Sequence, residues 1–122
     1  MKIVVTAADD NGLKAKLDSR FGRASYFAVV DTADDSVEFI KNDAKNASSG
    51  AGVQAAQTVA DTGADVLISG NIGPKAFDGL SRTDLEIYSG PEESIQKVID
   101  EYQLGNLEQL ESATKSAHAG LN

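Results

Sequence analysis

Two arginines in a glycine-containing loop are the residues of this chain whose types and spacing are best suited to chemistry. Arg20 and Arg23 flank Gly22 in the stretch Ser-Arg-Phe-Gly-Arg-Ala (residues 19–24), which runs directly into an apolar segment. An arginine side chain stays charged and presents a rigid set of donors, so a fixed pair beside accessible backbone can hold an anion. The alternative is that both arginines make surface ion pairs and that the glycine serves a turn, because exposed charges are usually only solvated.

This arginine loop (residues 19–24) lies in the basic part of an acidic chain. The protein has 11 basic and 19 acidic side chains and a formal net charge of -8. Residues 1–30 nevertheless carry five basic and three acidic side chains, a local balance of +2. A basic region on an acidic protein favours a small anion site over a broad polyanion-binding surface. We therefore expect no nucleic-acid partner, because nonspecific nucleic-acid affinity depends on neutralising many phosphates.

Two further glycine-containing loops each precede a predicted helix. They are residues 48–52 (Ser-Ser-Gly-Ala-Gly) and residues 69–73 (Ser-Gly-Asn-Ile-Gly). Helix N-termini expose unpaired N–H groups, and the loops of an open α/β sheet meet beyond the strand ends, so both loops could join the arginine loop around one anion. Each loop alone is equally explained as turn chemistry. The candidate binding residues are Ser19, Arg20, Phe21, Gly22, Arg23, Gly50, Ala51, Gly52, Gly70 and Asn71.

The remaining reactive side chains of the chain give little support for a catalytic site. Asp9, Asp10, Asp18 and Asp31 could surround the divalent metal of a hydrolase. We favour a simpler explanation, in which Asp9 and Asp10 cap a turn and Asp18 pairs with a nearby arginine or lysine. Asp31 then marks the end of a strand. His118 is the only imidazole and lies in a Ser/Ala-rich tail. The chain has no cysteine and no recognisable nucleophile with its base, so we expect a protein that is not an enzyme.

The elements that position these loops follow from hydrophobic patterning. The predicted order is β-β-β-α-β-α-β-α, with a hairpin first and then βα units that cross over onto the same sheet. This order predicts an α/β fold with a mixed five-stranded sheet and helices on both faces. The predicted strands cover residues 2–8, 26–31, 66–68 and 85–88, with a further strand after residue 35 in which Val37 and Phe39 alternate with polar neighbours; the helices cover residues 52–62, 74–80 and 91–102.

Length and composition predict one domain over residues 1–105, followed by a short docked segment and a mobile C-terminal tail over residues 106–122. Apolar residues make up 41% of the 122 residues, which is typical of a soluble globular protein. No apolar run approaches the ~20 residues that cross a bilayer. The N-terminus shows no secretory signal, so we expect a cytoplasmic protein without a membrane partner.

Three stretches resemble the dinitrogenase iron–molybdenum cofactor biosynthesis family. They are SRFGRASYF (residues 19–27), GAGVQAA (residues 50–56) and GADVLISGNIGPKAF (residues 63–77), and the resemblance covers about residues 1–110. It implies a ribonuclease-H-like fold and the binding, carriage or insertion of iron–sulfur or molybdenum-containing clusters without substrate turnover. The chain is similar to small stand-alone members, some of which are associated with a molybdenum–copper sulfide cluster outside nitrogen fixation.

The resemblance implies a metallocluster carrier of anaerobic metabolism, and the lack of cysteine restricts how this chain could hold its cargo. A cluster would be held as a preformed anion by backbone N–H groups, hydroxyls and the two arginines. Arg20 and Arg23 would neutralise charge, Gly50 and Gly52 would let the backbone approach closely, and Asn71 would donate a hydrogen bond. The alternative is an interaction subunit of a larger assembly, with protein partners and no bound cluster.

Overall fold

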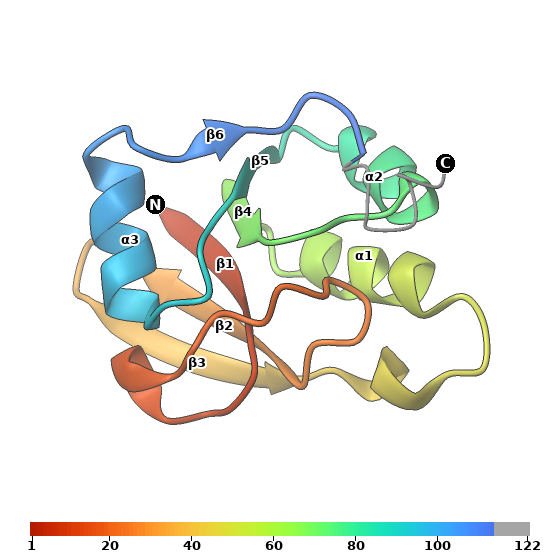
Figure 1. Cartoon of the computed structure of the whole chain (residues 1–122), viewed down its shortest axis with the longest axis horizontal. Coiled ribbons are helices and arrows are strands. Elements are labelled where there is room, and N and C mark those ends of the chain that lie inside the picture. The colour runs from red at the N-terminus through yellow and green to blue at the C-terminus, as the bar shows by residue number, and fades with distance from the viewer. Residues whose placement is uncertain (114–122) are drawn as a thin grey trace.

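Residues 1–113, the residues that the computed structural model describes, form a mixed sheet with helices on both faces (Figure 1). The sheet has six strands in the order β3-β2-β1-β4-β5-β6. β2 pairs antiparallel with β1 and β3, β4 pairs parallel with β1 and β5, and β6 pairs antiparallel with β5. No helix within this part of the chain is long and apolar enough to cross a membrane. The elements are β1 (Lys2–Ala7), η1 (Gly12–Lys14), β2 (Tyr26–Asp31), β3 (Ser36–Lys41), η2 (Asp43–Asn46), α1 (Ala51–Asp61), β4 (Val66–Ser69), α2 (Pro74–Ser81), β5 (Glu86–Ser89), α3 (Ile95–Gln103) and β6 (Glu108–Gln109), where η marks a 3₁₀-helix.

The predicted order of the first five strands and three helices is confirmed, whereas the predicted total of five strands is wrong. The sixth strand, β6, forms because the chain after α3 returns to the sheet beside β5. The Leu110 N–H donates to the Ile87 carbonyl oxygen at 2.7 Å, and Leu107 and Leu110 pack against the core. The strand β6 consists of two polar residues, which are too few to show a period-2 alternation, so hydrophobic periodicity could not predict it. The ribonuclease-H-like assignment stays a prediction. Of the segment predicted as a docked piece and mobile tail (residues 106–122), residues 114–122, which include His118, lie outside the described residues.

The third helix begins later than predicted. Proline was expected at its first position, but Ser94 is the N-cap, and its hydroxyl accepts from the Lys97 N–H at 3.2 Å. The preceding residues are held by another segment, because the Leu17 N–H donates to the Glu93 carbonyl oxygen at 2.9 Å. The Ile95 N–H likewise donates to the Ala15 carbonyl oxygen at 2.8 Å. These long-range backbone bonds keep residues 91–94 out of the helix.

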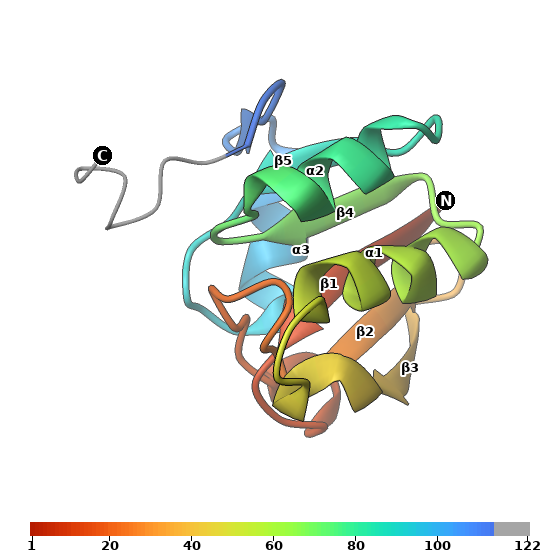
Figure 2. The same ribbon diagram turned by 90° about the vertical axis from the view of Figure 1, so that its right-hand side faces the viewer.

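The core has two layers, one on each face of the sheet. Alternating side chains of β1 point to opposite faces, so Ile3 and Val5 pack toward α3 while Val4 packs toward α1 and α2. Figure 2 shows α1 and α2 side by side in front of the sheet, with α3 behind it. The first turns of α1 and α2 therefore start from the same end of the sheet, beside the arginine loop.

Candidate functional site

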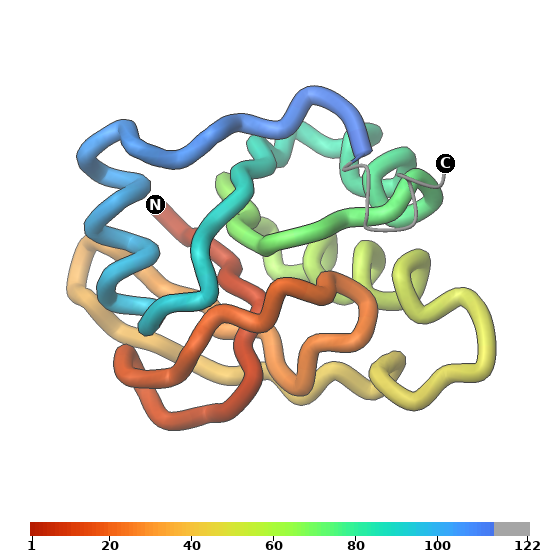
Figure 3. Tube along the Cα trace, viewed as in Figure 1, coloured from red at the N-terminus to blue at the C-terminus, as the bar shows by residue number. Residues whose placement is uncertain are grey.

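The three predicted loops meet in backbone contact. Figure 3 shows the arginine loop in orange, beside the start of α1 and the segment that joins β4 to α2. A Cβ atom on Gly22 would lie 2.9 Å from the Gly52 nitrogen, so only glycine allows this approach. A Cβ atom on Gly70 would lie 2.6 Å from Ser19 Cα. The Asn71 N–H donates to the Ser19 carbonyl oxygen at 2.6 Å, which links the first loop to the third.

A cavity of about 380 Å³ opens where these loops meet. We call it the central cavity; its lining residues are Phe21, Gly22, Gly52, Asn71, Gly73, Pro74, Lys75 and Ala76. Its walls are mostly aromatic, aliphatic and glycine groups, with Asn71 and Lys75 as the polar side chains. Four of the predicted site residues therefore line one cavity, although they come from three separate loops.

Lys75 was missed by the sequence analysis, and a signal for it was present. It follows Pro74 in the first turn of α2, where the helix dipole is positive and a cation is unfavourable. The first turn of α2 contains no acidic residue that would compensate this charge. A lysine at an uncompensated helix N-terminus marks a place where an anion would be stabilised.

The N-termini of α1 and α2 lack the side-chain caps that other helices use. Gly50, the N-cap of α1, has a left-handed conformation (φ 74), and Gly73 is the N-cap of α2; neither has a side chain to accept from the first-turn N–H groups. The first turn of α1 also has no acidic residue. In contrast, the serine hydroxyl at position 94 caps α3. Both helices thus begin at the central cavity, which Gly52 of α1 and Pro74, Lys75 and Ala76 of α2 line, without a side-chain cap at their positive dipole ends.

Arg20 lies in a neighbouring cavity instead of the central one. Its Nε and Nη2 atoms donate to the Asp18 carboxylate at 3.1 and 2.9 Å, and its backbone N–H donates to the same carboxylate at 2.9 Å. Burial raises the pKa of Asp18, but the hydrogen bonds and charge of Arg20 outweigh this and hold that pKa below its usual value. The hydrogen bonds to Asp18 in turn raise the pKa of Arg20. Ser19 and Arg20 line a cavity of about 600 Å³ together with Lys16 and Glu92.

Arg23 is directed away from the central cavity. Its Nη1 atom donates to the Lys45 carbonyl oxygen at 2.8 Å and to the Ala47 carbonyl oxygen at 2.6 Å. These carbonyl groups lie at the end of η2, where helix carbonyls lack partners within the helix. Arg23 thus fastens η2 to the arginine loop. The proposed role of both arginines as direct ligands of an anion stays a prediction.

Asn42 was also missed, although it determines the shape of the arginine loop. The residue is only 4% exposed, and its Nδ2 atom donates to the carbonyl oxygens of Gly22 at 3.1 Å and Ala24 at 2.8 Å. Its Oδ1 atom accepts from the Ala44 N–H at 3.1 Å. The available signal was a single polar amide directly after the alternating pattern of β3. A fully bonded buried amide rigidifies its surroundings, and here it holds a wall of the central cavity.

The aspartates do not gather into a metal site. The Asp9 carboxylate accepts from the Asn11 N–H at 3.0 Å, and that of Asp31 accepts from the Ala33 N–H at 3.0 Å, as turn caps do. Asp18 is engaged by its arginine. Within residues 1–113, no three acidic, histidine or cysteine side chains are grouped so that they could hold a metal ion. The hydrolase alternative therefore lacks a site in the described part of the chain.

Comparisons with known proteins agree with the motifs. The sequence model of the family described as dinitrogenase iron-molybdenum cofactor matches residues 1–105. The apo form of the orange protein from Desulfovibrio gigas has a similar structure, with a TM-score of 0.88 and 36% identity over 93% of this chain and 96% of that chain. A candidate NifB protein from Thermotoga gives a TM-score of 0.81 and 28% identity over 95% and 98% of the two chains. The uncharacterized protein MJ0580 of Methanocaldococcus jannaschii is 31% identical over 79% of this chain and 84% of its own.

Proposed function

Because the chain belongs to the dinitrogenase iron-molybdenum cofactor family, we propose that it binds and carries an anionic metal–sulfide cluster without catalysing a reaction. The cargo contains molybdenum, together with copper or with iron. The observation that supports this proposal is the central cavity, where two uncapped helix N-termini, Asn71 and Lys75 converge between apolar walls.

The chemistry of the cavity walls suits sulfide better than a hydrated oxyanion. Cluster sulfides are large and polarizable, and they accept only weak hydrogen bonds. They can therefore contact the ring of Phe21 and the aliphatic groups of Pro74 and Ala76 while backbone N–H groups and Lys75 offset the negative charge. The chain contains no cysteine, so no thiolate of this protein would bond to the metal. Binding is consequently electrostatic and packing-based, and it weakens as salt increases.

In this proposal the arginines act from beside the central cavity. Arg20 keeps its bond to Asp18, yet 63% of its side chain is exposed, so its positive charge still contributes to the local potential. Arg23 positions the loop through η2. Lys75 is the cationic side chain that lines the central cavity, and it is the residue we expect to matter most for the charge of the cargo.

The test is cluster retention by the full chain. Metal-free protein is incubated anaerobically with tetrathiomolybdate, alone and with copper(I), passed through a desalting column and assayed for molybdenum, copper and absorption. We expect stoichiometric molybdenum on the protein at low salt. Lys75→Gln removes one charge worth about 1 kcal/mol, so it should weaken retention roughly fivefold. Lys97→Gln removes the same charge from α3, in an ion pair with Glu101 at 3.8 Å, and should bind like wild type.

Equal retention by wild type and Lys75→Gln would contradict the assignment of the central cavity. Absence of retained metal, both after reconstitution and after anaerobic purification from the native host, would instead favour an interaction subunit. One observation supports that second function: Val53, in the first turn of α1 beside Gly52, is an apolar side chain that is 51% exposed. A protein that copurifies with wild type and is lost with Val53→Asp would support it.

A further inference from the structure

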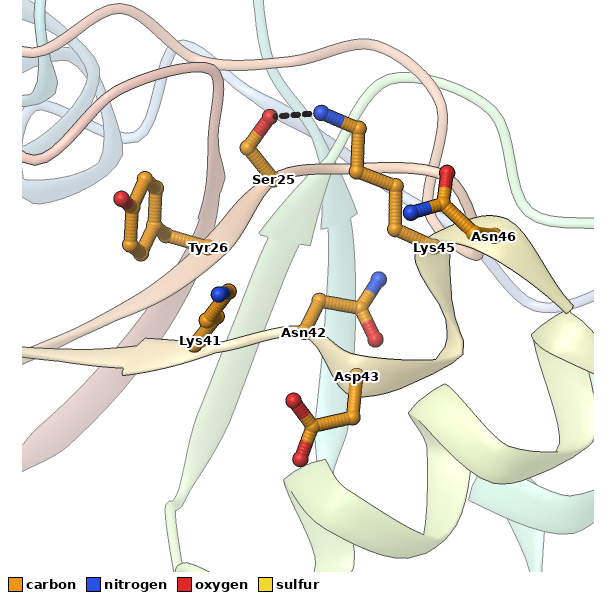
Figure 4. A pocket seen from close by; sticks show the side chains of 7 residues that line it. All are labelled: Ser25, Tyr26, Lys41, Asn42, Asp43, Lys45 and Asn46. Carbon is orange, nitrogen blue, oxygen red and sulfur yellow. Dashed lines mark hydrogen bonds between the residues drawn. The ribbon is translucent and has the colours of Figure 1, made fainter.

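A second cavity lies on the other side of the arginine loop, between the start of β2 and η2 (Figure 4). Its volume is about 360 Å³, and we call it the lysine cavity. It is lined by Ser25, Tyr26, Lys41, Asn42, Asp43, Lys45 and Asn46. Every residue of its lining carries a polar side-chain group, whereas the walls of the central cavity are mostly apolar, so the two cavities suit different ligands.

Two lysines, Lys41 and Lys45, line this cavity together with one carboxylate, that of Asp43. The Lys45 Nζ atom donates to the Ser25 hydroxyl at 2.8 Å, as the dashed line in Figure 4 shows. None of the four ion pairs formed within residues 1–113 includes Lys41 or Lys45. Two lysines and one aspartate give the cavity lining a formal charge of +1 (two positive, one negative), so it is a locally positive region in a protein with a net charge of -8.

The backbone around the lysine cavity is held in place independently of any ligand. Arg23 donates to the Lys45 carbonyl oxygen at 2.8 Å, which fixes the helical turn that carries this lysine. Asn42 lies in the wall with its amide bonded to the carbonyl oxygens of Gly22 and Ala24. The cavity is therefore preorganised, which lowers the cost of binding a small ligand.

We propose that the lysine cavity binds a phosphate-class dianion, either free phosphate or a phosphate monoester, between Lys41 and Lys45. Ammonium groups, the Ser25 hydroxyl and the Asn46 amide are donors of the kind that charged phosphate oxygens accept from strongly. The Asp43 carboxylate, at the opposite side of the cavity from Lys45 in Figure 4, opposes an anion and limits its affinity. This inference does not depend on the cluster proposal, because it concerns a different cavity with different chemistry.

The experiment is a calorimetric titration of the metal-free full chain with inorganic phosphate at low ionic strength. We expect saturable binding with one site per chain. The double variant Lys41→Gln/Lys45→Gln should bind at least tenfold more weakly, because both cationic donors are lost. Lys97→Gln, which changes net charge away from the cavity, should change affinity less than twofold. Asp43→Asn should bind phosphate more tightly than wild type. This gain in affinity would not occur if the residues of the cavity affected only the stability of the fold.

Failure to bind phosphate, or equal binding by wild type and the double variant, would overturn the proposal. A loss of affinity of the same size in Lys97→Gln would also overturn it, since the effect would then come from net charge alone. A parallel titration with glycerol 3-phosphate distinguishes the two sources of the ligand: tighter binding than phosphate assigns an ester, and weaker binding assigns the free ion. Both lysines are exposed, and circular dichroism checks that the double variant is folded.

Discussion

Replacing Gly22 with alanine tests whether the arginine loop is packed against the start of α1. The new Cβ atom would lie 2.9 Å from the Gly52 nitrogen, 3.0 Å from its Cα and 3.2 Å from the Ala51 carbonyl carbon. Relaxed contacts between such atoms are about 3.5–4.0 Å, so the two backbones would have to separate by roughly 0.5–1 Å. Because the contacted atoms belong to the backbone, no flexible side chain can absorb the change.

The expected loss of stability follows from two opposing terms. Overpacking of this kind costs ~1–3 kcal/mol. Alanine in place of glycine also restricts the unfolded chain, which returns ~0.4–1 kcal/mol. We therefore expect Gly22→Ala to lower the free energy of unfolding by about 1–2 kcal/mol. With a urea dependence of ~2 kcal/mol per molar, this corresponds to a midpoint roughly 0.5–1 M lower.

Equilibrium urea unfolding followed by circular dichroism measures this difference directly. Gly73→Ala is the matched control, because a Cβ atom there meets nothing within 4 Å. The control should stay within about 0.5 kcal/mol of wild type, because the loss of glycine at the N-cap of α2 and the restriction of the unfolded chain have opposite effects on stability. A Gly22→Ala midpoint equal to or above that of wild type would refute the packed arrangement of the loops, and with it the central cavity.

Two further substitutions test the polar groups that hold the arginine loop. Asn42→Ala leaves the buried carbonyl oxygens of Gly22 and Ala24 without their donor, so we expect a loss of about 2–3 kcal/mol in urea unfolding; a loss below about 0.5 kcal/mol would contradict this role. Because Arg20 holds the pKa of Asp18 below its ordinary value of 3.8, the stabilisation is fully present above that pH and disappears as pH falls below it through the folded-state pKa. Asp18→Asn should cost about 1 kcal/mol at neutral pH, after allowance for the solvent exposure of Arg20, and should flatten the stability profile below pH 3.8. An unchanged acid profile in this variant would show that another carboxyl group controls it.

Much of the fold was predictable because the relevant signals are local. The alternating and continuous apolar runs identified β1 to β5, and glycine or proline marked most helix boundaries. The convergence of the three loops was predictable as well, since the loops that follow the strands of an open α/β sheet lie along one edge. Sequence reasoning therefore predicts that Phe21, Gly22, Gly52 and Asn71 lie together, and all four line the central cavity.

Residue types and hydrophobic period are thus sufficient to predict the order of the first five strands and three helices, the family, and the three loops that meet at the central cavity. Only the tertiary structure decided which partners the charged groups take: Arg20 bonds Asp18, while Arg23 bonds η2. It also decided that Lys75 lines the central cavity and that β6 joins the sheet. These outcomes depend on distances between residues far apart in the chain, and neither residue type nor hydrophobic period contains that information. A guanidinium group bonds whichever acceptor the fold brings within about 3 Å of it.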